Sequence, residues 1–162
     1  MAATESTGPV APVPIILTIA LSMFLLGGFI LGAISNFFTP LPIWPGIWTR
    51  VVGIVPLTVG TCLLATARDA FTRHKTPTEP WERAVALIQD GPYRFTRNPI
   101  YLSVVTIFLG VSLIDNSALL LVVLAIDFIL VDRIQVPLEE RYLQETFGDT
   151  YSQYKAKVRR WI

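Results

Sequence analysis

The sequence predicts an all-α membrane protein with about four transmembrane helices and a C-terminal amphipathic helical tail. Three observations lead to this fold class. Hydrophobic residues make up 52% of the 162 residues, and the mean hydropathy is +0.56. Charged residues make up only 15%, whereas a soluble domain carries about 25%. The apolar residues are gathered into four runs with polar or proline-rich connections, so we expect one membrane domain over residues 1–162.

The first two runs predict two N-terminal spans. Residues 14–34 contain no charged side chain, and about 20 apolar residues suffice to cross the hydrocarbon core of a bilayer. Within this run Gly28 and Gly32 form a GxxxG pattern, which is typical of close helix–helix packing. The second run, residues 51–67, follows a proline-rich connection, and Pro56 is expected to kink its helix.

The third and fourth runs predict an antiparallel helical hairpin. Residues 99–114 and residues 117–131 are apolar, and Asp115-Asn116 forms a tight turn between them. Asp127 interrupts the fourth run. Because a carboxylate in hydrocarbon is costly, its side chain should face protein or water.

The tail after the hairpin predicts two short helices. Pro137 is expected to break the chain after the fourth span, and residues 139–147 then form a helix that stops at Gly148. Asp149 or Thr150 can cap a second helix. The two helices share one apolar face, formed by Leu143, Phe147, Tyr151, Tyr154, Val158 and Trp161. Such a face suits a segment that lies on a membrane surface or caps its own bundle.

The basic residues predict the orientation. Every Lys and Arg except Arg50 lies either between the second and third spans or after the fourth. The positive-inside rule places both regions, and both termini, in the cytoplasm. We expect a multi-pass protein, of the plasma or inner membrane if bacterial, with its site facing the cytoplasm. Its parts are two N-terminal spans (1–73), a cytoplasmic loop (74–98), the hairpin (99–136) and the tail (137–162).

Two polar pieces bracket the hairpin and form the candidate site. The run GPYRFTRNPIY spans residues 91–101, and Glu139-Glu140 opens the tail on the same predicted side. Aromatic rings beside a carboxylate suit a ligand with diffuse positive charge. Adjacent acids on a helix point about 100° apart. One can therefore bind a cation while the other pairs with Arg or faces solvent.

Several other classes of site are disfavoured. No GxGxxG follows a predicted strand, and no GxxxxGK[ST] is present. His74 and Cys62 are the single residues of their types, so neither a Ser-His-Asp set nor a metal cluster is expected. We also expect no nucleic-acid partner.

The ordered motifs resemble the isoprenylcysteine carboxyl methyltransferase family, of the bacterial type. This family belongs with the phospholipid N-methyltransferases among integral-membrane methyltransferases. The motif residues are Gly91, Tyr93, Arg97-Asn98-Pro99, Tyr101, Glu139-Glu140, Phe147-Gly148 and Tyr151. The resemblance covers about the last 90 residues, including the ending KVRRWI, and a weaker stretch at His74 to Pro80.

The resemblance implies a cofactor and the residues that bind it. The methyl donor would be S-adenosylmethionine, bound at the cytosolic end of the hairpin without a Rossmann fold. Glu139 would be its acidic ligand, and the segment from Val85 to Ile88 would offer backbone contacts. The implied cofactor residues are Val85, Ala86, Leu87, Ile88, Gly91, Tyr93, Asn98, Pro99, Ile100, Tyr101, Glu139 and Glu140.

Two positions depart from the family pattern. Asn98 stands where many members have His, so it can orient a group but cannot act as a base. Gln135 stands where eukaryotic members place an Arg near the substrate carboxylate. Arg133 lies close and could substitute. Arg133 and Asn98 are therefore the catalytic candidates, and Arg133 and Gln135 the substrate-binding ones.

The expected reaction is methyl transfer to a lipophilic acceptor that enters from the bilayer. A carboxylate of an isoprenoid-like or prenylcysteine-like compound is the first candidate acceptor. The alternatives are methylation of a phospholipid amine, an NADPH-dependent reductase and a non-enzymatic membrane scaffold. The expected partners are the acceptor and membrane lipids, while the oligomeric state stays open.

Overall fold

The structure, a computed structural model, describes residues 15–75 and 84–162 and is all-helical over these residues. The expectations for the N-terminal end and most of the His74 to Pro80 match lie outside the described residues. The helices are α1 (Ile15–Phe38), α2 (Trp48–Arg73), α3 (Pro99–Ile114), α4 (Ala118–Leu130) and α5 (Val136–Lys157). A 3-10 turn, η1 (Gly91–Arg94), precedes α3, and a π-helical segment, η2 (Val131–Gln135), joins α4 to α5. The all-α prediction is confirmed.

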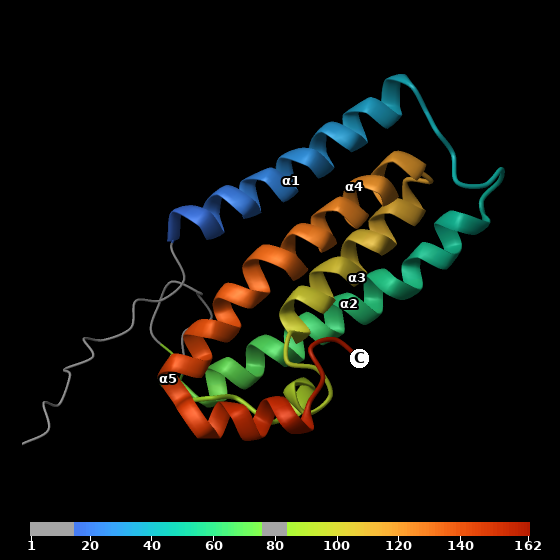
Figure 1. Ribbon diagram of the computed structural model, residues 1–162. Helices are drawn as coiled ribbons and strands as arrows, with labels where there is room; N and C mark the ends of the chain where they lie inside the picture. Colours follow the sequence, from blue (N-terminus) through green and yellow to red (C-terminus); the bar gives the residue numbers. More distant parts are fainter. Residues whose placement is uncertain (1–14, 76–83) are drawn as a thin grey trace, which may run out of the picture.

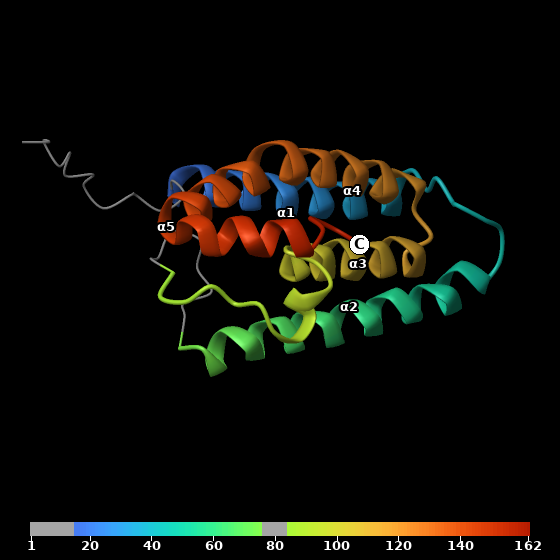
Figure 2. The same ribbon diagram turned by 60° about the horizontal axis from the view of Figure 1, so that its bottom comes forward.

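Four helices lie side by side in the order α1, α4, α3, α2 (Figure 1). Helix α5 turns across one end of this row, where it meets the loop that leads into α3 (Figure 2). The turn between α3 and α4 lies at the opposite end. The 84–98 loop and the tail therefore meet at one end of the bundle, as the charge distribution predicts.

The packing of α2 on α3 depends on glycine. A Cβ atom at Gly110 would lie 2.6 Å from the backbone nitrogen of Leu57 and 2.8 Å from the carbonyl oxygen of Gly53. A Cβ atom at Gly60 would lie 2.8 Å from the backbone nitrogen of Ile107. The two backbones approach so closely that no side chain fits between them, as is common for small residues between membrane helices.

The predicted GxxxG pattern packs α1 against α4. A Cβ atom at Gly32 would lie 2.7 Å from a methyl group of Leu120, and one at Gly28 would lie 3.4 Å from Val123. Phe29 beside them packs against Phe108 of α3 with the rings tilted by 41° and their centroids 4.3 Å apart. The packing role of the pattern is confirmed.

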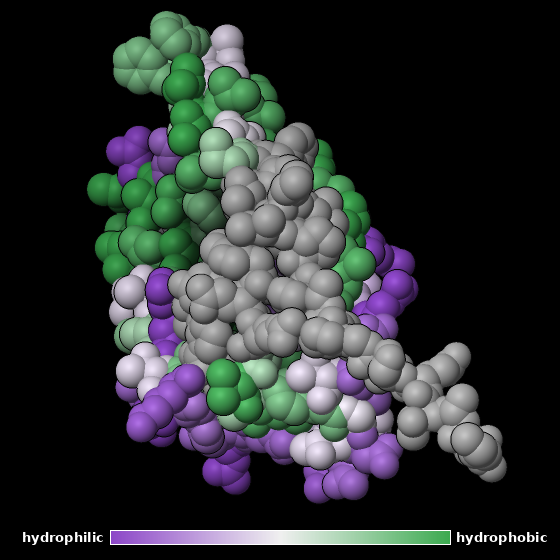
Figure 3. Space-filling model, turned by 90° about the vertical axis from the view of Figure 1, so that its left-hand side faces the viewer, coloured by the Kyte–Doolittle hydropathy of each residue, from purple (hydrophilic) through white to green (hydrophobic). Residues whose placement is uncertain are grey.

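The surface of the long helices is apolar. Among the described residues, α2 is long and apolar enough to cross a membrane, and Leu26–Phe38 and α3 are shorter apolar helices. Large apolar side chains such as Leu31 and Val55 are more than half exposed. In Figure 3 apolar surface occupies much of the upper part of one face, and hydrophilic residues gather at the lower end with α5. This distribution suits helices surrounded by lipid.

The hairpin agrees closely with its predicted bounds. Helix α3 begins at Pro99, and α4 begins after Ser117, whose hydroxyl accepts a hydrogen bond from the backbone nitrogen of Leu120 at 3.3 Å. Asp127 is only 7% exposed, so the prediction that it faces protein is consistent with its burial. Helix α2 continues unbroken through Pro56.

The predicted break at Pro137 is wrong. Helix α4 continues through η2 directly into α5, and Pro137 lies in the first turn of α5. Pro137 has no N–H to donate, and the π turn of η2 directly before it accommodates the proline without ending the helix. The predicted stop at Gly148 is confirmed as a kink, with φ 51° and ψ −124° inside α5.

Candidate active site

The loop before α3 brings the first group of candidate residues together. Val85 to Ile88 are neither helix nor strand, with Val85 72% exposed and Ile88 buried. Gly91 starts η1 with φ 54°, a left-handed conformation that glycine adopts at little cost. Tyr93 follows and is buried. The loop therefore presents a mixture of exposed and buried residues next to the start of α3.

Asn98 ends this loop, but its side chain does not cap α3. Its Nδ2 atom donates a hydrogen bond to the backbone carbonyl of Arg160 at 3.0 Å. Its backbone nitrogen donates to the hydroxyl of Thr96 at 3.2 Å, and that hydroxyl donates to the same carbonyl of Arg160 at 2.9 Å. The C-terminal residues thus fix the orientation of the Asn98 amide.

The two adjacent acids of α5 have different partners. The hydroxyl of Tyr101 donates a hydrogen bond to Glu139 at 3.0 Å. Glu140 accepts from Arg97 at 2.9 Å and from Arg160 at 2.8 Å, and its side chain is only 10% exposed. The prediction that the two carboxylates point differently, with one of them paired to Arg, is confirmed.

Glu139 is the electrostatically distinctive member of this cluster. Burial raises its pKa, the hydrogen bond from Tyr101 opposes that rise, and the charge of Glu140 adds to it. The pKa of Tyr93 is also raised, by burial and then by Glu139. Within the described part of the chain Glu139 has no ion-pair partner, so a cationic ligand could compensate its charge.

The tail forms hydrogen bonds with the loop that precedes α3. The hydroxyl of Tyr154 donates to the backbone carbonyl of Tyr93 at 2.7 Å. The backbone nitrogen of Arg97 donates to the carbonyl of Arg159 at 3.0 Å. The guanidinium of Arg97 donates to the hydroxyl of Tyr151 at 3.3 Å. The apolar face of α5 therefore caps its own bundle, with Tyr151 and Tyr154 buried.

The two substrate-binding candidates lie in different places. Gln135 is only 2% exposed, and its side chain is within hydrogen-bonding contact of Tyr101. The side chain of Arg133 is 80% exposed and contacts Asp132 at 3.4 Å. The structure brings Gln135, but not Arg133, to the Tyr101–Glu139 pair.

The motif pattern did not include the residues that connect the C-terminal end of the chain to the segment between α4 and α5. Trp161 donates to Asp132 at 2.9 Å, and Arg160 reaches the same carboxylate at 3.3 Å. The hydrogen bond from Trp161 contributes most to lowering the pKa of Asp132. The only sequence signal for this contact is an isolated acid directly after the fourth apolar run and an Arg-Trp pair at the C-terminal end.

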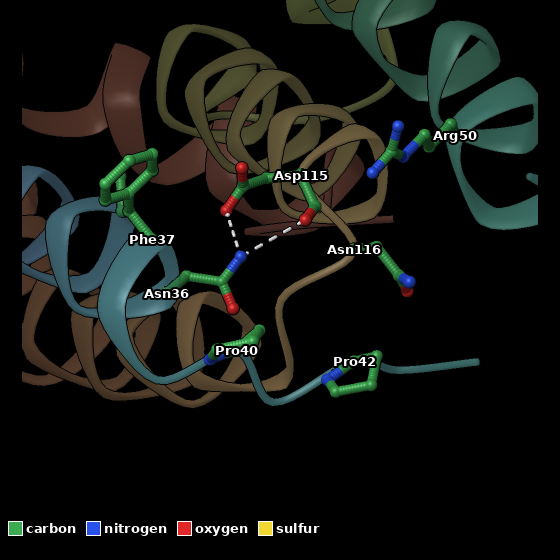
Figure 4. Close-up of a pocket in the computed structure, with 8 residues that line it drawn as sticks. Asn36, Phe37, Pro40, Pro42, Arg50, Asp115 and Asn116 are labelled. Carbon is green, nitrogen blue, oxygen red and sulfur yellow. Dashed lines mark hydrogen bonds between the residues drawn. The ribbon is translucent and has the colours of Figure 1, made fainter. Parts of the chain in front are cut away.

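A cavity of about 410 Å³ lies at the other end of the bundle (Figure 4). It is formed by the end of α1, the connection to α2 and the α3–α4 turn. Asn36 donates to the carboxylate of Asp115 at 2.9 Å and to its backbone carbonyl at 3.3 Å. Tyr101 is near the start of α3, whereas Asp115 and Asn116, which line this cavity, follow the end of α3.

Known proteins match the part of the chain that forms the site. The protein family described as phospholipid methyltransferase matches residues 48–150, from α2 into α5. A Haemophilus influenzae protein described as uncharacterized is 38% identical over 63 residues, which are 39% of this chain and all of that protein. Methanethiol S-methyltransferase 1 of Bradyrhizobium diazoefficiens is 38% identical over 66 residues, 41% of this chain and 22% of that protein.

These matches agree with the resemblance to membrane methyltransferases that the motifs predicted. The chain spans about a fifth of the length of the Bradyrhizobium relative, whereas the family match covers more than half of this chain. The region matched contains Asn98, Tyr101 and Glu139 together with the helices that position them. The chain belongs to the phospholipid methyltransferase family.

Proposed function

We propose that the protein is an S-adenosylmethionine-dependent methyltransferase that methylates a lipophilic acceptor at the cytoplasmic end of its bundle. The observation that carries this proposal is the Tyr101–Glu139 hydrogen bond of 3.0 Å, in which a partly buried carboxylate without an ion-pair partner among the described residues lies beside aromatic rings. A sulfonium cofactor with an ammonium group matches that chemistry. Family membership supports a methyltransferase.

The cofactor would be held between the 85–101 segment and the first turn of α5. Glu139 supplies the negative charge, and Tyr101 orients that carboxylate. Asn98 cannot titrate and is fixed by Arg160, so we assign it an orienting role. When bound, S-adenosylmethionine supplies an electrophilic methyl group whose carbon–sulfur bond breaks as the acceptor bonds to carbon.

The surroundings of this site favour an anionic acceptor. An anion and a sulfonium give neutral products, so charge decreases in the transition state and an environment poor in water favours the reaction. An amine would first have to lose a proton, which Asn98 cannot accept, and the carboxylate of Glu139 is assigned to the cofactor in this proposal. We therefore propose a carboxylate of an isoprenoid-like compound as the acceptor. In this proposal Gln135 lies beside the acceptor.

A sulfur acceptor is the second candidate. The Bradyrhizobium relative is named a methanethiol S-methyltransferase. A thiol must first lose its proton, unlike a carboxylate, but the thiolate that results loses its charge in the transition state as a carboxylate does. Proximity and alignment of the reacting atoms would be the main contribution of the protein in either case.

A transfer assay tests this proposal and separates the acceptors. Purified protein in lipid nanodiscs is incubated with methyl-labelled S-adenosylmethionine and an isoprenoid carboxylate, a lipophilic thiol or a lipid amine. Alkali releases labelled methanol from a methyl ester but not from a thioether or a methylated amine. We expect alkali-labile label on the carboxylate. Label confined to the amine would contradict the anionic acceptor, and binding of NADPH without any transfer would favour a reductase.

A further inference from the structure

We propose that Arg160 is a positioning residue that joins the two halves of the cofactor site. The loop half is the segment before α3, and the helix half is the start of α5. This inference rests on the proposed function. Arg160 lies three residues after the end of α5, and its carbonyl and guanidinium contact different halves. We call Arg160 and Trp161, with the contacts they make, the C-terminal clasp.

The carbonyl oxygen of Arg160 holds the loop half. It accepts hydrogen bonds from the hydroxyl of Thr96 at 2.9 Å and from the amide of Asn98 at 3.0 Å. Both donors are buried, at 3% and 8% exposure. Because a carbonyl has two lone pairs, one oxygen satisfies both donors. The register of the C-terminal residues therefore sets the position of Asn98, which immediately precedes α3.

The guanidinium of Arg160 holds the helix half. Its Nε and Nη2 atoms contact the two oxygens of Glu140 at 3.2 and 2.8 Å, and its Nη1 atom contacts Asp132 at 3.3 Å. The hydrogen bond with Glu140 is the largest of the effects that raise the pKa of Arg160. Bidentate pairs of this kind fix orientation as well as distance.

Trp161 secures the same connection. Its indole nitrogen donates to Asp132 at 2.9 Å, and its ring lies 5.0 Å from that of Phe128 between centroids. Asp132 belongs to η2, the segment that leads from α4 into α5. The C-terminal clasp thus contacts the loop, η2 and Glu140 near the start of α5 simultaneously.

The clasp determines how far apart the cofactor contacts lie. Glu139 is adjacent to Glu140, and Tyr101 is three residues from Asn98, so each proposed cofactor contact is next to a residue that Arg160 holds. Without the Arg160 guanidinium, the backbone carbonyl at position 160 remains, but it loses its link to Glu140, which keeps only Arg97 at 2.9 Å and Lys155 at 4.0 Å. Glu140 therefore acts as an anchor for Arg97 and Arg160.

The test compares neighbouring arginines in the full chain. Arg160→Ala, Arg160→Lys and Arg159→Ala are purified, and binding of S-adenosylhomocysteine is measured by calorimetry together with the thermal melting temperature. Arg159 is exposed and contributes only its backbone carbonyl to Arg97, which the alanine variant keeps. We expect an affinity loss of about tenfold for Arg160→Ala, the size expected for a charged hydrogen bond. Arg160→Lys should lose less, and Arg159→Ala should stay within about twofold.

The outcomes are separable. A purely structural role would lower the fraction of binding-competent protein while leaving the affinity of that fraction unchanged, and this result would overturn the proposal. Unchanged affinity and stoichiometry in Arg160→Ala would overturn it as well. If Arg160→Ala does not fold, the affinity of Arg160→Lys for S-adenosylhomocysteine is compared with that of wild type instead. This variant keeps the charge, and an unchanged affinity would again overturn the proposal. Absence of binding by the wild-type protein would instead overturn the proposed function.

Discussion

Adjacent residues of one type have different roles at this site. Glu139 and Glu140 share a helix turn, but Glu140 is held by Arg97 and Arg160, whereas Glu139 accepts a hydrogen bond from Tyr101. The angular separation of neighbouring helix positions causes this division. It makes Glu139 the residue whose charge is available to a cationic ligand.

Replacing Tyr101 by Phe tests the orientation of that carboxylate. The substitution keeps the ring but removes the hydroxyl that donates to Glu139. Because a hydrogen bond to a charged group contributes about 1.5–3 kcal/mol, we expect affinity for S-adenosylhomocysteine to fall by about tenfold or more. Calorimetric titration measures this directly. An unchanged affinity would mean that the orientation of Glu139 does not matter for binding.

The raised pKa of Glu139 predicts a dependence on pH. As the pH falls through that raised pKa, toward the ordinary value of 4.5, the carboxyl becomes neutral and binding of a cationic ligand should weaken. The folded protein binds this proton more tightly than the unfolded chain, so the same step should increase stability. Titrations across this range with wild type and Glu139→Gln check the prediction. An equal decline of affinity in both proteins would assign the effect to another group.

The sequence motifs identify Tyr101, Glu139 and Gln135, but not the residues that hold them. Asn98 contacts Arg160, which lies 62 residues further along the chain. No local pattern encodes such a contact, because it depends on how α5 turns back across the end of the bundle. Arg133 lies in η2 with its side chain 80% exposed, which the motif pattern does not predict.

At the scale of the elements, local signals predict helix ends where the cap is local. Pro99 at the start of α3, Ser117 before α4 and Gly148 inside α5 each act within a few residues, and all three positions agree with the structure. Pro137 does not end the helix, because the π turn of η2 directly before it accommodates the proline. The π turn before it has no comparably clear sequence signal.

The glycine contact between α2 and α3 predicts a loss of stability. In Gly110→Ala the added Cβ would lie 2.6 Å from the backbone nitrogen of Leu57, and backbone cannot move aside easily. Overpacking of this kind costs typically about 1–3 kcal/mol, so the melting temperature in detergent should fall.

The matched control for this prediction is Gly27→Ala. A Cβ atom at Gly27 would meet no other atom within 4 Å, and alanine favours a helix by roughly 0.5–1 kcal/mol. The melting temperature of Gly27→Ala should therefore stay level or rise. A Gly110→Ala protein as stable as wild type would show that the two helices can separate at no cost.

At the scale of the whole molecule, composition and charge distribution predict the all-helical class and the meeting of loop and tail. They do not predict the order of the helices. Helix α1 packs on α4, which is distant from it in the chain, whereas α2 packs on α3 and α3 on α4, which follow one another in sequence (Figure 1). This arrangement follows from glycine contacts between specific helix faces, which a single sequence does not pair.

The basic residues predict on which side of the membrane each end of the bundle lies. In a Cys62→Ala background, single cysteines are introduced as Arg50→Cys and Lys157→Cys. We expect an impermeant maleimide to label the cysteine at position 50 in intact spheroplasts and that at position 157 only after permeabilisation, because the positive-inside rule places the tail in the cytoplasm. Labelling of both without permeabilisation would contradict the proposed orientation.

Binding of S-adenosylhomocysteine tests the central claim most directly. Wild type, Glu139→Ala and the control Glu145→Ala, which changes an exposed acid on the same helix, are titrated by calorimetry. We predict saturable binding by wild type and by Glu145→Ala, and a loss of about tenfold or more in affinity for Glu139→Ala. Equal affinity of Glu139→Ala and wild type, or no binding by wild type, would contradict the assignment of this site.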